Sequence, residues 1–334
     1  MSCRRSCFRL IAACCLAWSG LTGSVSAADS IESPDKFPSR PITITVTFPP
    51  GGGTDILARL IGNYLGETTG HASVVENKPG ASGNLGAKFV AERAPDGYSL
   101  LMAPPPFVIN PTLYGKANYD PIRDFAPVTM CGSVPSLLVS HPSVPARTLR
   151  ELIQLARANP NKLSYASGGI GSTPHLAGEL LKSLTKTQIV HVPYKGGTMG
   201  LIGAMSGEVD IVFATMSAAS ASYINEGKMR GLAILDSKRV KTVPQVPTSA
   251  EAGLPQLIAI NWYVLMAPAG TPRDIIDRLN AEIAKVMQTA ETRERLLAVG
   301  GEPATGTPEQ AADFLRSEYA RWSKLIKDAG IRAE

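Results

Sequence analysis

The 334-residue sequence has almost no cysteine outside its N-terminus. Four of its five cysteines lie within the first 28 residues, which leaves Cys131 alone in the remainder of the chain. A single cysteine allows no internal disulfide and no cysteine-based metal site. We predict that Cys131 is a small buried hydrophobic residue, because a reactive thiol needs a basic neighbour and none is close in sequence.

Charge is also scarce and nearly balanced. Charged residues make up 18% of the chain and hydrophobic residues 44%, which is typical of a folded globular protein and not of a disordered one. The formal net charge is +5, but Arg4, Arg5 and Arg9 lie in the first 28 residues, which contain no acid. Subtracting these three leaves +2 for the rest. This balance argues against a nucleic-acid partner.

The longest apolar stretch of the N-terminus, "LIAACCLAW", is too short for a membrane anchor. It follows a basic start and precedes the small residues "SVSAA", an order typical of an export signal cleaved after Ala27 or Ala28. We therefore predict a signal peptide at residues 1–28 and a periplasmic location for the rest. The letters "IAAC" ending at Cys14 resemble a lipoprotein box, but the apolar segment before them is short, so lipidation is not expected.

Motifs of catalysis and nucleotide binding are missing. The sequence has four histidines but no H-E-x-x-H pair, no G-x-S-x-G elbow and no G-x-x-x-x-G-K-[ST] loop. A G-x-G-x-x-G fingerprint fails as well, since the sixth position from Gly51 or Gly169 is not glycine. We predict no catalytic residue, no metal and no cofactor. A secreted enzyme that uses Ser172 and His175 on a small acid stays as an alternative.

What the sequence does contain is a repeated order of strand, loop and helix, which predicts an α/β protein with mostly parallel sheets. Strands are predicted at 41–48, 73–77, 136–145, 162–167, 188–194, 209–215, 229–236 and 261–270, and one more follows the turn that opens residues 95–103. Helices follow several of them, and two terminal helices are predicted at 272–297 and 308–329. The pattern restarts after the first third, so we predict two lobes: residues 29–140 plus 259–334, and residues 141–258.

Two glycine loops occupy matching places in these lobes, each between a strand and a helix. They read "TFPPGGGTD" (47–55) and "SGGIGSTPH" (167–175). Helix N-termini carry unpaired N–H groups and attract anions, and glycine allows a ligand close to the backbone. Both loops offer amides and hydroxyls but no arginine, which suits a carboxylate better than a phosphate.

Single residues in the loops have more than one interpretation. Asp55 either supports the helix dipole and pairs with Arg59, or contacts a ligand. Thr173 is predicted to cap the second helix, with proline following at its first position. That start would aim the amides of Gly171 and Ser172 outward.

With these motifs in place, the chain resembles the substrate-binding proteins of tripartite tricarboxylate transporters, the Bug-type receptors. The stretches that carry the resemblance are "RPITITVTFPPGGGTDILAR", "VENKPGASGNLGAKFVAERAPDGYSLLMA", "YASGGIGSTPHLAGELL", "HVPYKGG", "VPTSAEAGLP" and "APAGTPRDIIDRLN". The resemblance covers nearly all of residues 38–332. It implies a two-lobed periplasmic-binding-protein fold of type II-like architecture, with the ligand cleft between the lobes.

The family resemblance also implies ligand, partners and site. The ligand is a small organic carboxylate, and the partners are a large and a small integral-membrane permease subunit; we expect a monomer. The implied ligand-binding residues are Phe48, Gly51, Gly52, Gly53, Thr54, Asp55, Ser167, Gly168, Gly171, Ser172 and His175. A receptor that presents its ligand to a membrane sensor is the alternative. Residues 214–216 lack an acid that many family members carry, which predicts a ligand whose second half is apolar or a plain acid.

Overall fold

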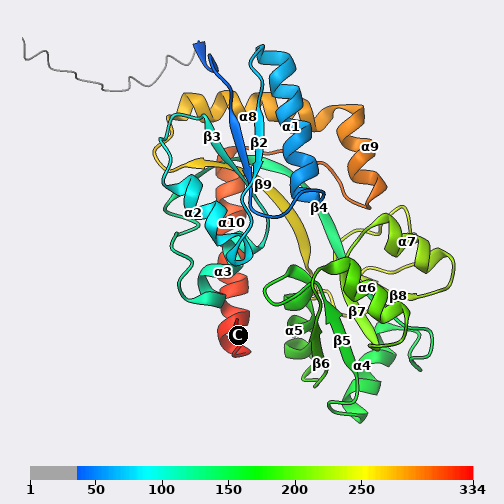
Figure 1. Cartoon of the computed structure of the whole chain (residues 1–334). Helices are drawn as coiled ribbons and strands as arrows, with labels where there is room; N and C mark the ends of the chain where they lie inside the picture. Colours follow the sequence, from blue (N-terminus) through cyan, green and yellow to red (C-terminus); the bar gives the residue numbers. More distant parts are fainter. Residues whose placement is uncertain (1–35, 334) are drawn as a thin grey trace, which may run out of the picture. The chain divides into compact units, whose positions relative to one another are not determined.

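The computed structural model describes residues 36–333, and Figure 1 shows its mixed α/β architecture. The predicted signal peptide at residues 1–28 lies outside the described residues. The strands are β1 (Thr43–Val46), β2 (Val74–Asn77), β3 (Ser99–Ala103), β4 (Phe125–Ser140), β5 (Ser164–Ser167), β6 (Val190–Pro193), β7 (Ile211–Thr215), β8 (Arg230–Ile234) and β9 (Ile260–Pro268). The helices are α1 (Gly53–Thr69), α2 (Asn84–Ala91), α3 (Pro106–Tyr114), α4 (Leu149–Ala158), α5 (Thr173–Thr185), α6 (Gly197–Met205), α7 (Ala218–Asn225), α8 (Arg273–Gln288), α9 (Ala290–Ala298) and α10 (Pro308–Asp328).

The strands join in the order β2-β1-β3-β9-β4-β7-β5-β6, with β8 paired to β4. The outer strands are parallel: β1 pairs with β2 and β3, and β5 pairs with β6 and β7. The two central strands, β4 and β9, run antiparallel to their neighbours. The α/β prediction is confirmed, and the parallel pairing holds in the outer parts of the sheet.

Strand β4 links these two parts. Its residues 125–135 pair with β9, whereas residues 136–140 pair with β7 and β8. Register shifts next to Thr129 and at Gly132, which has φ +147°, bend the strand where it passes from one partner to the next. The predicted strand at 136–145 was therefore misplaced. It extends back to Phe125 and ends at Ser140, because a turn containing Pro142 and Pro145 follows.

The core lies between the strands and the helices on both faces. Strand β1 is buried along its last three residues, as expected for a parallel strand covered on both sides. Helix α1 turns its apolar stripe toward β1 and β2, and the fully buried members of that stripe are Leu57, Ala58, Ile61 and Leu65. The helical spacing predicted after the first glycine loop is confirmed.

The prediction of one long helix at 272–297 is wrong. Two helices replace it, α8 and α9, and Thr289 separates them with an extended backbone (φ −64°, ψ 148°). The side chain of Thr289 accepts a hydrogen bond from the amide of Thr292 and so caps α9. Local capping therefore overrides the continuous apolar pattern, and α9 takes a new direction, as Figure 1 shows.

Helix α3 was not predicted, because three consecutive prolines at 104–106 hid it. Proline is tolerated in the first turn of a helix, where its missing N–H is not needed. By contrast, α10 begins and ends as predicted. Its start is fixed by a capping box in which the side chains of Thr307 and Gln310 each bond the other's backbone.

Candidate functional site

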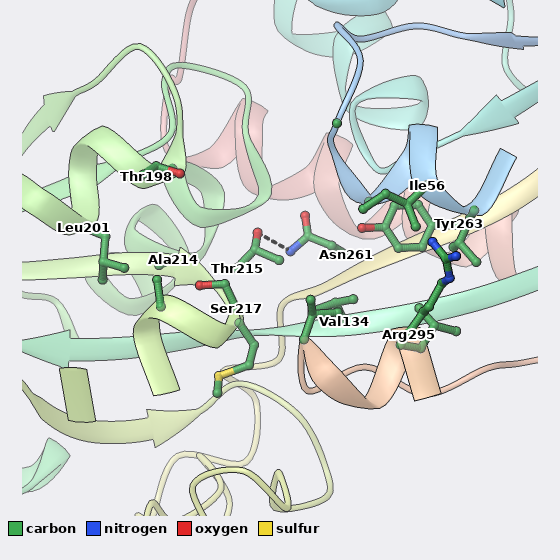
Figure 2. A pocket seen from close by; sticks show the side chains of 18 of the residues that line it. Ile56, Val134, Thr198, Leu201, Ala214, Thr215, Ser217, Asn261, Tyr263 and Arg295 are labelled. Atoms are coloured by element: carbon green, nitrogen blue, oxygen red, sulfur yellow. Dashed lines mark hydrogen bonds between the residues drawn. The ribbon is translucent and has the colours of Figure 1, made fainter. Parts of the chain in front are cut away.

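A cavity of about 400 Å³ lies against α1, β4, α6, β7, β9 and α9 (Figure 2). Its walls are mainly apolar, with a few hydroxyl and amide groups. The lining residues are Gly51, Gly53, Ile56, Leu57, Leu60, Val134, Gly197, Thr198, Leu201, Ala214, Thr215, Met216, Ser217, Ala219, Asn261, Tyr263, Arg295, Leu296 and Val299. A volume of this size accommodates a small organic molecule.

The first glycine loop (residues 47–55) reaches the cavity through Gly51 and Gly53. Gly52 caps helix α1 without a side-chain hydrogen bond. The N–H groups of Gly53 and Thr54, which open the helix, have no acceptor within residues 36–333. The positive end of a 17-residue helix is thus presented at the cavity wall.

Asp55 holds this loop in place. Its carboxylate accepts hydrogen bonds from the Gly51 amide at 3.0 Å, from the Arg59 guanidinium at 3.0 Å and from the Asn77 amide at 2.9 Å. Burial raises the pKa of the Asp55 carboxyl, but these hydrogen bonds outweigh it and the pKa lies below its usual value. The pairing of Asp55 with Arg59 is confirmed, and all three partners of the carboxylate belong to the chain itself.

The second glycine loop (residues 167–175) turns its amides inward. The amide of Gly171 donates to Nδ1 of His175 at 3.2 Å, and the amide of Ser172 donates to the carbonyl of Gly169 at 3.2 Å. The expectation that these amides point outward is wrong, because the helix start closes on itself. The cap is also one residue earlier than predicted: Ser172, not Thr173, accepts from the amide of His175.

Below this loop lies a buried polar cluster. His175 stacks on His191 with 4.2 Å between ring centroids, and His191 stacks on Tyr165 at 4.6 Å. Burial lowers the pKa of each histidine to about 4, so both rings are neutral at pH 7. Nε2 of His191 lies 2.7 Å from Oγ of Ser167.

This cluster offers no accessible nucleophile. Ser167, which contacts His191, is fully buried. Ser172 donates its hydroxyl to the carbonyl of Gly169 at 2.7 Å, and its Oγ accepts a hydrogen bond from the backbone amide of His175 at 3.2 Å. A serine activated by a histidine needs that hydroxyl within reach of the ring nitrogen and of a substrate.

The predicted site residues fall into two groups. Gly51 and Gly53 line the cavity, with Gly52, Thr54 and Asp55 directly beside them in the same loop. Half-buried Phe48 lies near the beginning of the same loop, and its carbonyl accepts a hydrogen bond from Asn77. The second-loop residues are not part of the cavity lining; they are Ser167, Gly168, Gly171, Ser172 and His175.

Other cavity residues escaped the sequence analysis. Asn261 on β9 donates to Oγ1 of Thr215 at 2.9 Å and to Oγ of Ser136 at 3.3 Å, and so ties β9 to β7 and β4 at the cavity wall (Figure 2). The segment 214–216, singled out as lacking an acid, lines the cavity as well. Thr215 is the last residue of β7. Because ligands of α/β proteins bind at the carboxyl ends of strands, its position could have identified it as a candidate. No local signal pointed to Arg295.

Residues 36–333 contain neither a cluster of metal-binding side chains nor a helix suited to a membrane. Within residues 36–333, His, Cys, Asp and Glu side chains nowhere gather in threes to hold a metal ion. Among the helices of the same residues, none combines the length and hydrophobicity that crossing a lipid bilayer requires.

Solved structures with the same fold define the class. A periplasmic transporter matches with a TM-score of 0.77 and 36% identity over 89% of this chain and 99% of its own. An adipate-bound protein from R. palustris matches with the same TM-score and 37% identity over 89% and 99% of the two chains. The periplasmic binding protein BugD matches with a TM-score of 0.74 and 30% identity over 89% and 100%. The chain thus has the fold of periplasmic binding proteins of the two-lobed type.

The sequence comparisons narrow this class to a family. Residues 57–331 match the model of the tripartite tricarboxylate transporter family receptor. BugT of Bordetella pertussis (strain Tohama I) is 35% identical over 95% of both chains. A protein from the tcbD-tcbE intergenic region of Pseudomonas sp. (strain P51) is 38% identical over 90% of this chain and 89% of its own. The chain belongs to the tripartite tricarboxylate transporter receptor family, as its motifs predicted.

Proposed function

We propose that this protein captures a small organic carboxylate in the cavity and delivers it to a membrane permease built from a large and a small subunit. The observation that carries the proposal is the start of helix α1, where Gly51 and Gly53 line an otherwise largely apolar cavity. Unpaired helix amides there provide charge-assisted hydrogen bonds to a carboxylate and offset the cost of removing it from water.

Related proteins support the ligand class. One solved relative, 37% identical, was determined with adipate, and MatC of Rhodopseudomonas palustris, 33% identical, was determined with bound malate. Both ligands are small dicarboxylates. The cavity of about 400 Å³ has room for either.

The proposal includes location and architecture. The signal peptide at residues 1–28 would direct the protein to the periplasm. The ligand would be held between a lobe of residues 29–140 plus 259–334 and a lobe of residues 141–258. Support comes from strand β4, whose two halves pair with different strands on either side of residue 135. Ligand would shift an open and closed equilibrium by its preference for the closed form.

Ligand binding is tested on protein stripped of bound ligand by unfolding and refolding. A thermal-shift panel pairs each organic acid with its neutral amide, for example adipate with adipamide. We expect the acids to raise the melting temperature and the amides to leave it unchanged, because only the acids bear the charge that the helix amides hold. If folded, stripped protein responds to no acid in the panel, carboxylate capture is refuted.

Delivery is tested by reconstituting a candidate permease of one large and one small subunit in vesicles. We expect uptake of the identified acid only when the receptor is added. Binding without uptake would favour the alternative in which the protein presents its ligand to a membrane sensor.

A further inference from the structure

Arg295 is the charged side chain among the residues that line the cavity in the described part of the chain. It comes from α9, the short helix that begins anew at Thr289. Figure 2 shows Arg295 on the same side of the view as Ile56 and Tyr263, with Thr198 and Leu201 on the other side. A guanidinium in an otherwise uncharged cavity selects for an anionic group in the ligand.

The present partner of Arg295 does not hold it firmly. Its guanidinium lies 2.8 Å from the carboxylate of Glu291, one helical turn earlier on α9. The two side chains are 57% and 61% exposed, respectively. Exposed pairs of this kind contribute little to stability, because water and salt screen them. Arg295 is therefore free to exchange Glu291 for a carboxylate inside the cavity.

The walls that follow the start of helix α1 and those formed by α9 are largely apolar. Helix α1 contributes Ile56, Leu57 and Leu60, which follow Gly53 along one face. Leu296 and Val299 of α9 add to the apolar lining. Such walls favour a hydrocarbon segment in the ligand and give no partner to a charged amine, since no acid lines the cavity.

We propose that Arg295 binds a second acid group of the ligand, so that the cavity selects dicarboxylates with an apolar spacer over monocarboxylates of the same length. This inference rests on the proposed function, in which the amides at the start of α1 hold the first carboxylate. Arginine binds a carboxylate through two parallel N–H···O bonds, and this geometry makes Arg295 a specificity-determining residue.

Calorimetric titrations measure the affinity of the unaltered protein and of two variants for each of six acids. The ligands are succinate, adipate and suberate, each with its monoacid of equal length: butanoate, hexanoate and octanoate. The variants are Arg295→Gln and the matched control Arg293→Gln, which removes an exposed arginine of α9 that does not line the cavity. Thermal unfolding without ligand verifies that both variants fold.

For the best-fitting chain length, we expect the unaltered protein to bind the diacid about tenfold or more tightly than the monoacid. Arg295→Gln should weaken diacid binding about tenfold and change monoacid binding less than about twofold. Arg293→Gln should change neither. Equal losses for diacid and monoacid in Arg295→Gln, or no loss for either, overturn the inference while carboxylate binding stands. If the unaltered protein binds none of the six acids but responds to another acid of the thermal-shift panel, this inference falls while the proposed function stands.

Discussion

The imidazole rings of His175 and His191 stack with 4.2 Å between their centroids and 22° between their planes, beneath the second glycine loop. Both rings are neutral at pH 7, since burial lowers the pKa of each to about 4. Nδ1 of His175 accepts the amide of Gly171, a bond that requires the unprotonated nitrogen. The conformation of the loop is thus coupled to the protonation state of the pair.

This pair predicts a pH dependence of stability. In the unfolded chain each histidine titrates near 6.5, whereas in the folded protein it titrates at about 4. Between these values the unfolded state binds more protons, so the free energy of unfolding falls as pH decreases through this window and is fully present above it. We expect His175 to account for a loss on the order of 2 kcal/mol from pH 7 to about pH 4.5, and half-buried His191 to add a smaller loss because water screens it.

Urea unfolding across this pH range measures the effect. His175→Gln should flatten the dependence, because it removes one of the two depressed groups. His71→Gln, at a partly exposed position outside the cluster, should keep the full slope. An unaltered slope in both His175→Gln and His191→Gln would contradict the assignment.

Within the Asp55–Arg59 ion pair, we expect replacement of Asp55 to cost more stability and affinity than replacement of Arg59. Asp55→Ala removes the buried acceptor for Gly51, Arg59 and Asn77, which should cost about 1–3 kcal/mol in the free energy of unfolding. It should also weaken carboxylate binding, since Gly51 loses its anchor. Arg59→Ala should have a much smaller effect on both, because the Arg59 side chain is 49% exposed. Chemical denaturation and calorimetric titration measure the two effects, and equal losses in the two variants would contradict this role of Asp55.

We expect alanine to be disruptive at Gly53 and tolerated at the neighbouring Gly52. A Cβ at Gly53 would overlap the hydroxyl of Tyr263, whereas a Cβ at Gly52 meets no atom within 4 Å. Gly53→Ala should therefore displace the start of α1, lower stability by about 1–3 kcal/mol and weaken ligand binding. Gly52→Ala, at φ −82°, should change stability by less than about 0.5 kcal/mol.

A second substitution tests the cause of the Gly53 effect. Tyr263→Phe removes the overlapping hydroxyl, so the double variant with Gly53→Ala should recover part of the lost stability and affinity. Thermal unfolding and calorimetric titration provide the measurements. A double variant as impaired as the sum of its single changes would show that the two residues do not clash.

A negative charge introduced at Asn261 tests whether the ligand is an anion. Asn261→Asp keeps the size of the side chain and can accept hydrogen bonds from the hydroxyls of Thr215 and Ser136, but it places a negative charge at the cavity wall. We expect carboxylate affinity to fall about 10–100-fold through repulsion at low effective dielectric. The control Asn118→Asp adds the same charge at an exposed position, and titration should show unchanged affinity. Equal affinity in the two variants would place the acid group away from Asn261.

The sequence by itself determined the features that depend on neighbours in the chain. Period-two and helical spacing predicted β1 and α1, and the glycines between them predicted a helix start suited to an anion. The capped start of α10 at Pro308 followed from local residues in the same way. Buried Cys131 also followed, and burial raises its pKa to about 12. Family motifs then gave the fold class, because they extend over nearly the whole chain.

Only the tertiary structure decided which of these features meet in one cavity. Gly53 lies against Tyr263, and Asn261 bonds Thr215, contacts between residues far apart in the sequence. The second glycine loop has the same local pattern as the first, yet its amides bond internally and its residues lie outside the cavity lining. Arg295 enters the wall because α9 changes direction at Thr289. Local patterns specify period and caps, whereas the surroundings of a side chain depend on packing between distant segments.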